Sequence, residues 1–130
     1  MTLPEQKGQK SFGLHDSRDM LEKLQWELNN LFCRQRHNIS VCQYHAFNCA
    51  VTAWHVTDWL WQDISSSLEL KTKLQEKIQN PLKKCKDFQR YVRVDCNALR
   101  LCHQIANGSK HFLVERDPDS TISAVISTGE

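Results

Sequence analysis

The sequence predicts an all-α fold, a bundle of four to five helices with a short extended or hairpin C-terminal tail. Apolar residues recur at helical spacing in several segments, and polar capping residues precede them. Extended segments around an Asp-Pro turn are confined to the C-terminal end. The 130 residues suffice for one domain with one modest core. We therefore expect a flexible N-terminal arm over 1–15, the helical bundle over 16–111 and the extended tail over 112–130.

The first helix is predicted over residues 17–36. Asp16 or Ser17 offers the N-cap, and acidic residues follow in the first turn, where they complement the positive end of the helix dipole. The apolar residues of this segment form one stripe, which makes the helix amphipathic. The members of the stripe are Met20, Leu24, Leu28, Leu31 and Phe32.

The second helix is predicted over residues 41–63 and is apolar on nearly every side. Three of the four tryptophans of the chain lie in this segment. Such a helix is expected at the centre of the bundle. Its few polar residues form one narrow stripe, which we expect to face the polar side of the last helix. The stripe consists of Asn48, Thr52, His55, and Asp58 or Gln62.

A third and a short fourth helix are predicted between residues 66 and 95. Ser66 and Glu69 have the spacing of a capping box and open the third helix. Its apolar face holds Leu70, Leu74 and Ile78, and Asn80-Pro81 ends it. Pro81 also suits the first position of a short helix. That helix carries Leu82, Cys85, Phe88 and Val92.

The last helix is predicted over residues 95–111, with Asp95 as its cap. One side is apolar, with Ala98, Leu101, Cys102 and Ile105. The other side carries Arg100, His103, Asn107 and His111. Two interpretations of this polar side stay open, a buried network that fixes helix register and a site that opens to solvent. Gly108 adds a second alternative, because it suits a helix C-cap that would turn His111 away from Arg100.

Composition limits the classes of function. The net charge is +2, so an anionic partner requires a local basic patch. The sequence has no glycine-rich phosphate loop, no zinc motif and no paired cysteines, so we expect neither cofactor nor metal. The six cysteines are scattered and the N-terminus lacks an apolar signal core, so we expect reduced thiols in a cytoplasmic protein. The sequence also has no apolar stretch long enough to cross a membrane, so we expect no membrane span.

The segment from Ala106 to His111 resembles the motif of the HEPN superfamily, small helical bundles of bacterial toxins, antiphage systems and RNA-processing enzymes. Asn107 and His111 match the Asn and His of that motif, whereas Ala106 stands where the family has Arg. The resemblance implies a dimer that cleaves RNA without a metal, with His111 as general acid and base and Asn107 beside it. Arg100 is the nearest substitute for the missing Arg, and His55 and Asp58 would form the facing wall.

A locally basic stretch precedes the last helix and has Phe88 and Tyr91 interleaved in it. Cations among aromatic rings bind nucleic acid through charge and stacking, although a solvated helix face is an equally good interpretation. The predicted RNA contacts are Lys83, Lys84, Lys86, Arg90, Arg93 and Lys110. The alternative function is a non-enzymatic module that binds a protein partner, such as an antitoxin, or that oligomerises.

Overall fold

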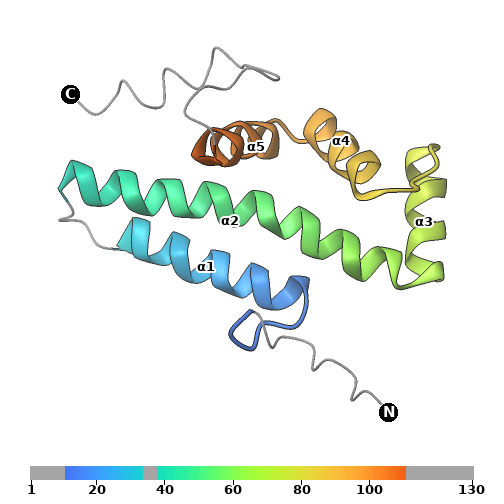
Figure 1. Ribbon diagram of the computed structural model, residues 1–130, viewed down its shortest axis with the longest axis horizontal. Coiled ribbons are helices and arrows are strands. Elements are labelled where there is room, and N and C mark those ends of the chain that lie inside the picture. The colour runs from blue at the N-terminus through green and yellow to red at the C-terminus, as the bar shows by residue number, and fades with distance from the viewer. Residues whose placement is uncertain (1–10, 34–37, 111–130) are drawn as a thin grey trace.

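The computed structural model describes residues 11–33 and 38–110, and every regular element in these ranges is a helix. The all-α bundle predicted from the sequence is thereby confirmed. The arm before residue 11 and the predicted tail over 112–130 lie outside the described residues. The helices are α1 (Ser17–Cys33), α2 (Ile39–Ser65), α3 (Leu68–Ile78), α4 (Cys85–Asp95) and α5 (Asn97–Lys110), as shown in Figure 1.

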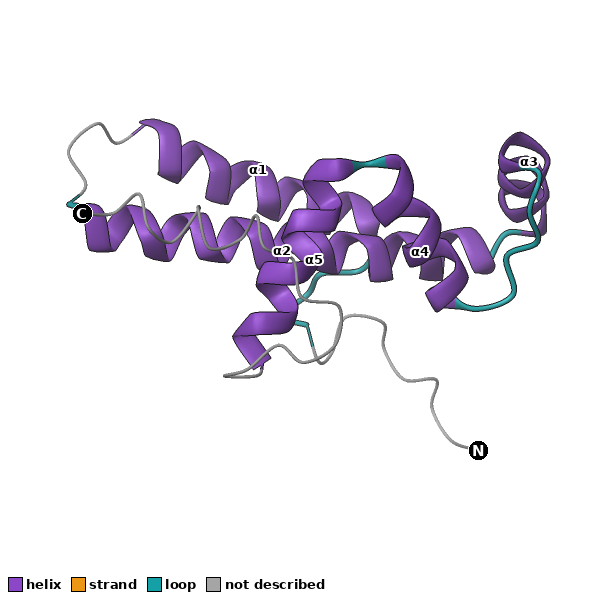
Figure 2. Cartoon of the chain, turned by 90° about the horizontal axis from the view of Figure 1, so that it is seen from above, coloured by secondary structure: helices purple, strands orange, loops and turns teal. Residues whose placement is uncertain are grey.

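Helix α2 is the centre of the arrangement and contacts each of the other four helices. Helix α1 runs antiparallel to it on one side, and α4 and α5 lie on the opposite side (Figure 1). Figure 2 shows α5 crossing the middle of α2, while α3 crosses the end of α2 that is far from the α1–α2 connection. The bundle therefore consists of an α-hairpin of α1 and α2, with α4 and α5 laid over one of its faces and α3 across the end of α2.

Helix α1 begins as the sequence predicted, with Asp16 as its cap. The Asp16 Oδ1 atom accepts a hydrogen bond from the Asp19 N–H at 2.9 Å. Asp63 of α2 accepts a further bond at 2.9 Å from the backbone N–H of Ser17, which fixes the start of α1 to α2. Met20 of the predicted apolar stripe is buried, as expected, but Phe32 at the far end of the stripe is 72% exposed.

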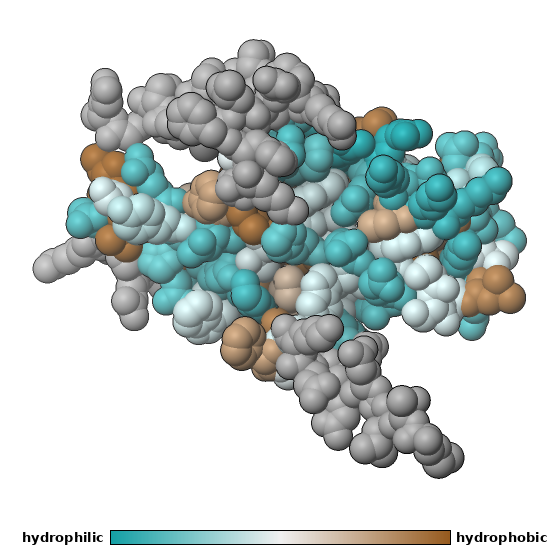
Figure 3. Space-filling view, in the orientation of Figure 1, coloured by the Kyte–Doolittle hydropathy of each residue, from teal (hydrophilic) through white to brown (hydrophobic). Residues whose placement is uncertain are grey.

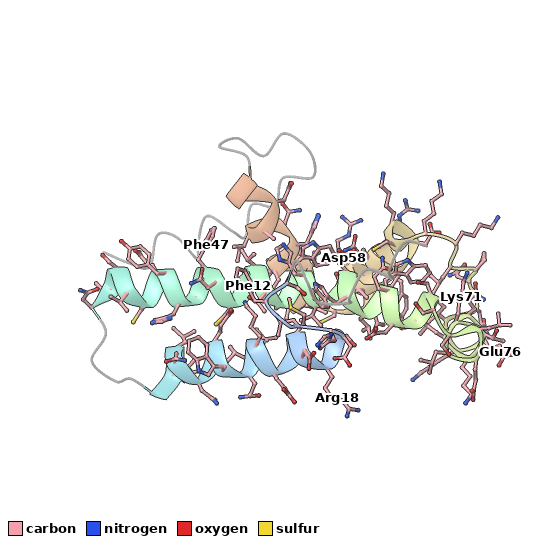
Figure 4. The ribbon with its side chains drawn as sticks, turned by 60° about the horizontal axis from the view of Figure 1, so that its bottom comes forward. Phe12, Arg18, Phe47, Asp58, Lys71 and Glu76 are labelled. Carbon is pink, nitrogen blue, oxygen red and sulfur yellow. The ribbon has the colours of Figure 1, made fainter. Side chains whose placement is uncertain are left out.

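Helix α2 is longer than predicted and is not covered on every side. Asn38 caps it, with its Oδ1 atom accepting from the Val41 N–H at 2.9 Å, so that the helix begins at Ile39 and not at 41. Tyr44 is 66% exposed and Phe47 is 45% exposed. Figure 4 shows Phe47 pointing away from α1. The physical reason is that α5 crosses only the middle of α2 and leaves its first turns uncovered on that side.

The main apolar core joins α2, α3 and α4. Trp61 and Phe88 stack with ring centroids 5.9 Å apart, and Leu82 is 2% exposed beside them. Leu74 and Ile78 of the predicted third-helix face close this core, whereas Leu70 of that face is 50% exposed. It comprises Trp61, Ile64, Leu82 and Phe88, surrounded by Leu74, Ile78, Cys85 and Val92.

The predicted starts of the third and fourth helices are also wrong, each because a neighbouring residue supplies the cap. Ser66 is the C-cap of α2, and the Oγ atom of Ser67 instead accepts from the Leu70 N–H at the start of α3. Helix α4 begins at Cys85 and not at Pro81. The Asp87 carboxylate accepts from the backbone N–H groups of the two residues before α4 at 3.0 Å each, and these bonds lower the pKa of Asp87.

The last predicted helix also starts later than expected. Asp95 ends α4, and α5 begins at Asn97, so Asp95 is not its cap. At the other end the helix continues through Gly108, so the C-cap interpretation of that glycine is wrong. The predicted apolar side needs a correction as well. Ala98 is exposed, whereas Gln104 and Ala106 are buried.

Candidate functional site

A cavity of about 330 Å³ lies where α4 and α5 meet the middle of α2. His55 and Asp58 on its wall are exposed, so the cavity opens to solvent. Two residues of the predicted α2 stripe, His55 and Asp58, therefore converge with His103 and Asn107 of α5 on an open site. The lining residues are Trp54, His55 and Asp58 of α2, Gln89 of α4, and His103, Ala106 and Asn107 of α5.

Helix α5 contributes an imidazole that packs on a tryptophan. The His103 and Trp54 ring centroids are 4.6 Å apart, with the ring planes tilted by 56°. Ala106, one turn later, is 4% exposed. It lines the cavity between His103 and Asn107.

Helix α4 is fixed to the same place by a chain of hydrogen bonds. The Gln89 amide donates to the Thr57 hydroxyl oxygen at 3.0 Å, and that hydroxyl donates to the Trp54 carbonyl at 2.6 Å. Thr57 is 4% exposed, so this connection lies inside the protein. The bonds hold the Gln89 side chain at the edge of the cavity and fix α4 to the turn of α2 that carries Trp54.

Asp58 connects the cavity to a cysteine of α4. The Cys85 thiol donates to the Asp58 Oδ1 atom across 3.2 Å. Burial and this hydrogen bond to a carboxylate raise the pKa of Cys85 to about 11. At neutral pH the thiol is therefore protonated and acts as a donor that positions Asp58. Figure 4 labels Asp58 on the part of α2 beneath α4 and α5.

The cations of α4 line a second depression of about 370 Å³ that continues from the first. Both are lined by Trp54, Gln89, His103 and Asn107. We call the two together the α4–α5 groove. Figure 3 shows a largely hydrophilic surface over α4. The second depression adds Lys86, Arg90 and Arg93, which recur at helical spacing on one side of α4.

The structure brings together part of the predicted site. His55, Asp58 and Asn107 line the groove with Lys86, Arg90 and Arg93. Lys83 and Lys84 precede α4 and are exposed. Lys110 is the last residue of α5, and His111 lies outside the described residues.

Arg100 occupies a different place from the one predicted. Its Nε and Nη2 atoms donate to the Asn97 side-chain oxygen at 3.0 and 2.7 Å. This hydrogen bonding turns the guanidinium toward the start of α5, and Arg100 is not among the residues that line the groove. The arginines beside His103 and Asn107 come from α4 instead.

Thr52 is a further correction, since it faces α1 and not α5. Its hydroxyl accepts from the Lys23 ammonium at 2.9 Å and donates to the Glu27 carboxylate at 3.0 Å. Lys23 also pairs with Glu27, one turn away on α1. Thr52 is 3% exposed, so this polar cluster belongs to the α1–α2 interface and not to the groove.

The sequence interpretation missed Trp54 and Gln89, and it placed His103 on the polar side of the last helix without giving it a role in the site. The signal for His103 is that it lies one turn before Asn107 on the same face. Trp54 and Gln89 carry no local signal that separates them from core and surface residues. Their place in the groove depends on how α4 and α5 dock.

Comparison with known proteins gives no match to a family model, to a curated protein or to a solved structure. Over the residues that the structure describes, no cluster of three His, Cys, Asp or Glu side chains is arranged to bind a metal ion. In the same ranges, the helices are too short or too polar to span a bilayer.

Proposed function

We propose that the α4–α5 groove binds single-stranded RNA. The observation that carries this proposal is that three cations line the same surface as an aromatic pair and an amide. Lys86, Arg90 and Arg93 supply positive charge for backbone phosphates, and the guanidinium of each arginine can bind a phosphate through two parallel hydrogen bonds. Trp54 and His103 offer ring surfaces for a base, and Asn107 offers a donor and an acceptor for its edge.

The choice of RNA over other anions rests on the resemblance to HEPN proteins and on the acid–base groups in the groove. His55 and Asp58 are one turn apart on α2, and His103 lies across the cavity from them. Cleavage of RNA through its own 2′-hydroxyl needs groups that remove and return protons near neutral pH, and histidine is suited to this role. Endonucleolytic cleavage is therefore the second function that we propose for the same groove.

Binding is tested by fluorescence anisotropy with a labelled 12-nucleotide RNA and a DNA of the same sequence. Three phosphate contacts predict a slope of about −2 for log Kobs against log salt, at roughly −0.7 per contact. Arg93→Ala should weaken binding about tenfold or more, because it removes a charged hydrogen bond. Arg18→Ala is the matched control, since Arg18 is exposed on α1, away from α4 and α5 (Figure 4).

Cleavage is tested on the same RNA with His55→Ala, His103→Ala and His111→Ala. The ribonuclease proposal expects product from the unaltered protein and loss of product in at least one variant that still binds RNA. Binding without product in the unaltered protein would leave an RNA-binding function only. A failure to bind RNA would remove both proposals and favour the protein-interaction alternative.

A further inference from the structure

Helix α4 carries a further depression on the face that adjoins the α4–α5 groove at Arg90. Its volume is about 380 Å³, and it lies between α4 and the end of α3. Asp87, Arg90, Tyr91 and Val94 share this face at helical spacing. Ile78, Asn80 and Pro81 form the opposite wall, and Leu82 closes the bottom.

The composition of this depression suits a planar, partly apolar group. Tyr91 supplies an aromatic ring, and Ile78 and Pro81 supply an apolar surface opposite to it. Val94 on its rim is 85% exposed. Asn80, also exposed, carries an amide that can donate and accept hydrogen bonds at the edge of a bound ring.

Arg90 connects this depression to the groove. It lines both of them, because it lies on the ridge of α4 between the two. Asp87, about one turn before Arg90 on the same face of α4, already accepts two backbone N–H groups at the start of the helix. An RNA strand that leaves the groove crosses this ridge. The Arg90 guanidinium would bind a phosphate of the strand there, and the pocket beside Tyr91 would hold the base that follows.

We infer that the pocket between Tyr91 and Pro81 holds one base of the same RNA strand, beyond the phosphate bound by Arg90. This inference rests on the proposed RNA binding of the groove. It extends the footprint of the strand across two faces of α4, with Trp54 and Tyr91 as separate stacking positions. Binding should therefore depend on RNA length, and a strand too short to cross the ridge should not use the pocket.

The test compares RNAs of 4 and 12 nucleotides on Tyr91→Ala, Tyr91→Phe and the control Tyr44→Ala, which removes an exposed tyrosine from α2. Loss of one stacked base should weaken binding of the 12-mer by about fivefold or more. Tyr91→Phe keeps the ring and should bind normally. The 4-mer should bind all of these variants with the same affinity as the unaltered protein.

Val94→Asp is a second variant, chosen because an 85% exposed side chain tolerates substitution without unfolding. Its carboxylate should repel the strand at the rim and weaken binding of the 12-mer only. Strands that carry 2-aminopurine at successive positions add an independent readout. Quenching at one position should disappear in Tyr91→Ala and return in Tyr91→Phe.

The inference would be overturned if the 12-mer bound Tyr91→Ala and Val94→Asp as tightly as it binds the unaltered protein. The groove would then be the whole binding site. Failure of the unaltered protein to bind any RNA would overturn the proposed function and this inference together. Loss of 12-mer binding in Tyr44→Ala as well would place the contact on α2 and overturn the assignment to α4.

Discussion

Replacement of Leu82 by alanine tests whether the α2–α3–α4 core holds α4 beside the groove. Leu82 is 2% exposed and lies on the connection between α3 and α4, against Trp61 and Phe88. Leu68, at the start of α3, is 80% exposed. The same Leu→Ala change at these two positions removes the same atoms from opposite environments.

The magnitude follows from the burial of the side chain. Leu→Ala removes three carbon atoms, each worth about 0.8 kcal/mol when fully buried, and the cavity left behind adds to this loss. We expect Leu82→Ala to lower the free energy of unfolding by about 3 kcal/mol. Leu68→Ala should change it by less than about 0.5 kcal/mol, as for other surface substitutions.

Urea unfolding followed by tryptophan fluorescence measures both variants, because Trp61 lies in this core. With a slope of about 1.5 kcal/mol per molar urea, Leu82→Ala should move the midpoint down by about 2 M. The slope itself should not change. Equal midpoints for Leu82→Ala and Leu68→Ala would refute the reasoning, since α4 would then be held in place by something other than this core.

Three further predictions concern polar groups. Thr52→Val removes the hydroxyl that hydrogen-bonds Lys23 and Glu27 inside the α1–α2 interface. It should lower the free energy of unfolding, measured by heat or urea, by about 1–3 kcal/mol. The control Thr72→Val, at an exposed position of α3, should leave this free energy almost unchanged. Cys85 has a pKa of about 11 in the folded protein against 9.0 without these contacts, so its contribution to stability is complete below about pH 9 and is lost as pH rises toward 11. The fall in the free energy of unfolding between pH 9 and 11 should be smaller in Cys85→Ala, and an unchanged fall would contradict this assignment. Asp87 has a lowered pKa because it accepts backbone N–H bonds. Its contribution to the free energy of unfolding is therefore present above about pH 4 and is lost as the pH falls further. Acid unfolding of Asp87→Asn, followed by circular dichroism, should depend less on pH than that of the unaltered protein.

Local sequence predicts most of the helical structure, because caps and periodicity act within a few residues. Asp16 begins α1 as predicted, and Leu74 and Ile78 of α3 face the core as predicted. The errors at helix starts come from competing caps. Asn38, Ser67 and Asp87 each satisfy N–H groups that another nearby residue could equally have satisfied, and only the path of the chain decides between them.

The site is predicted less completely, since it combines three helices distant in sequence. The spacing of His55 and Asp58 places both on one side of α2, and the spacing of His103 and Asn107 does the same on α5. Helical periodicity specifies which side chains share a face but not which helix that face meets. For this reason the prediction could not foresee that Thr52 would turn to α1 or that Arg100 would bond Asn97.

The sequence by itself therefore determined the five helical segments, the shared face of His55 and Asp58 on α2 and the basic side of α4, all of which are properties of single helices. The tertiary structure alone decided that Lys86, Arg90 and Arg93 lie beside Trp54 and His103. The physical reason is that the buried contacts of Leu82 and Phe88 with Trp61, together with the Gln89–Thr57 hydrogen bond, fix how α4 docks on α2. The free energy of those contacts is realised only when the helices meet, and they connect segments far apart in the chain.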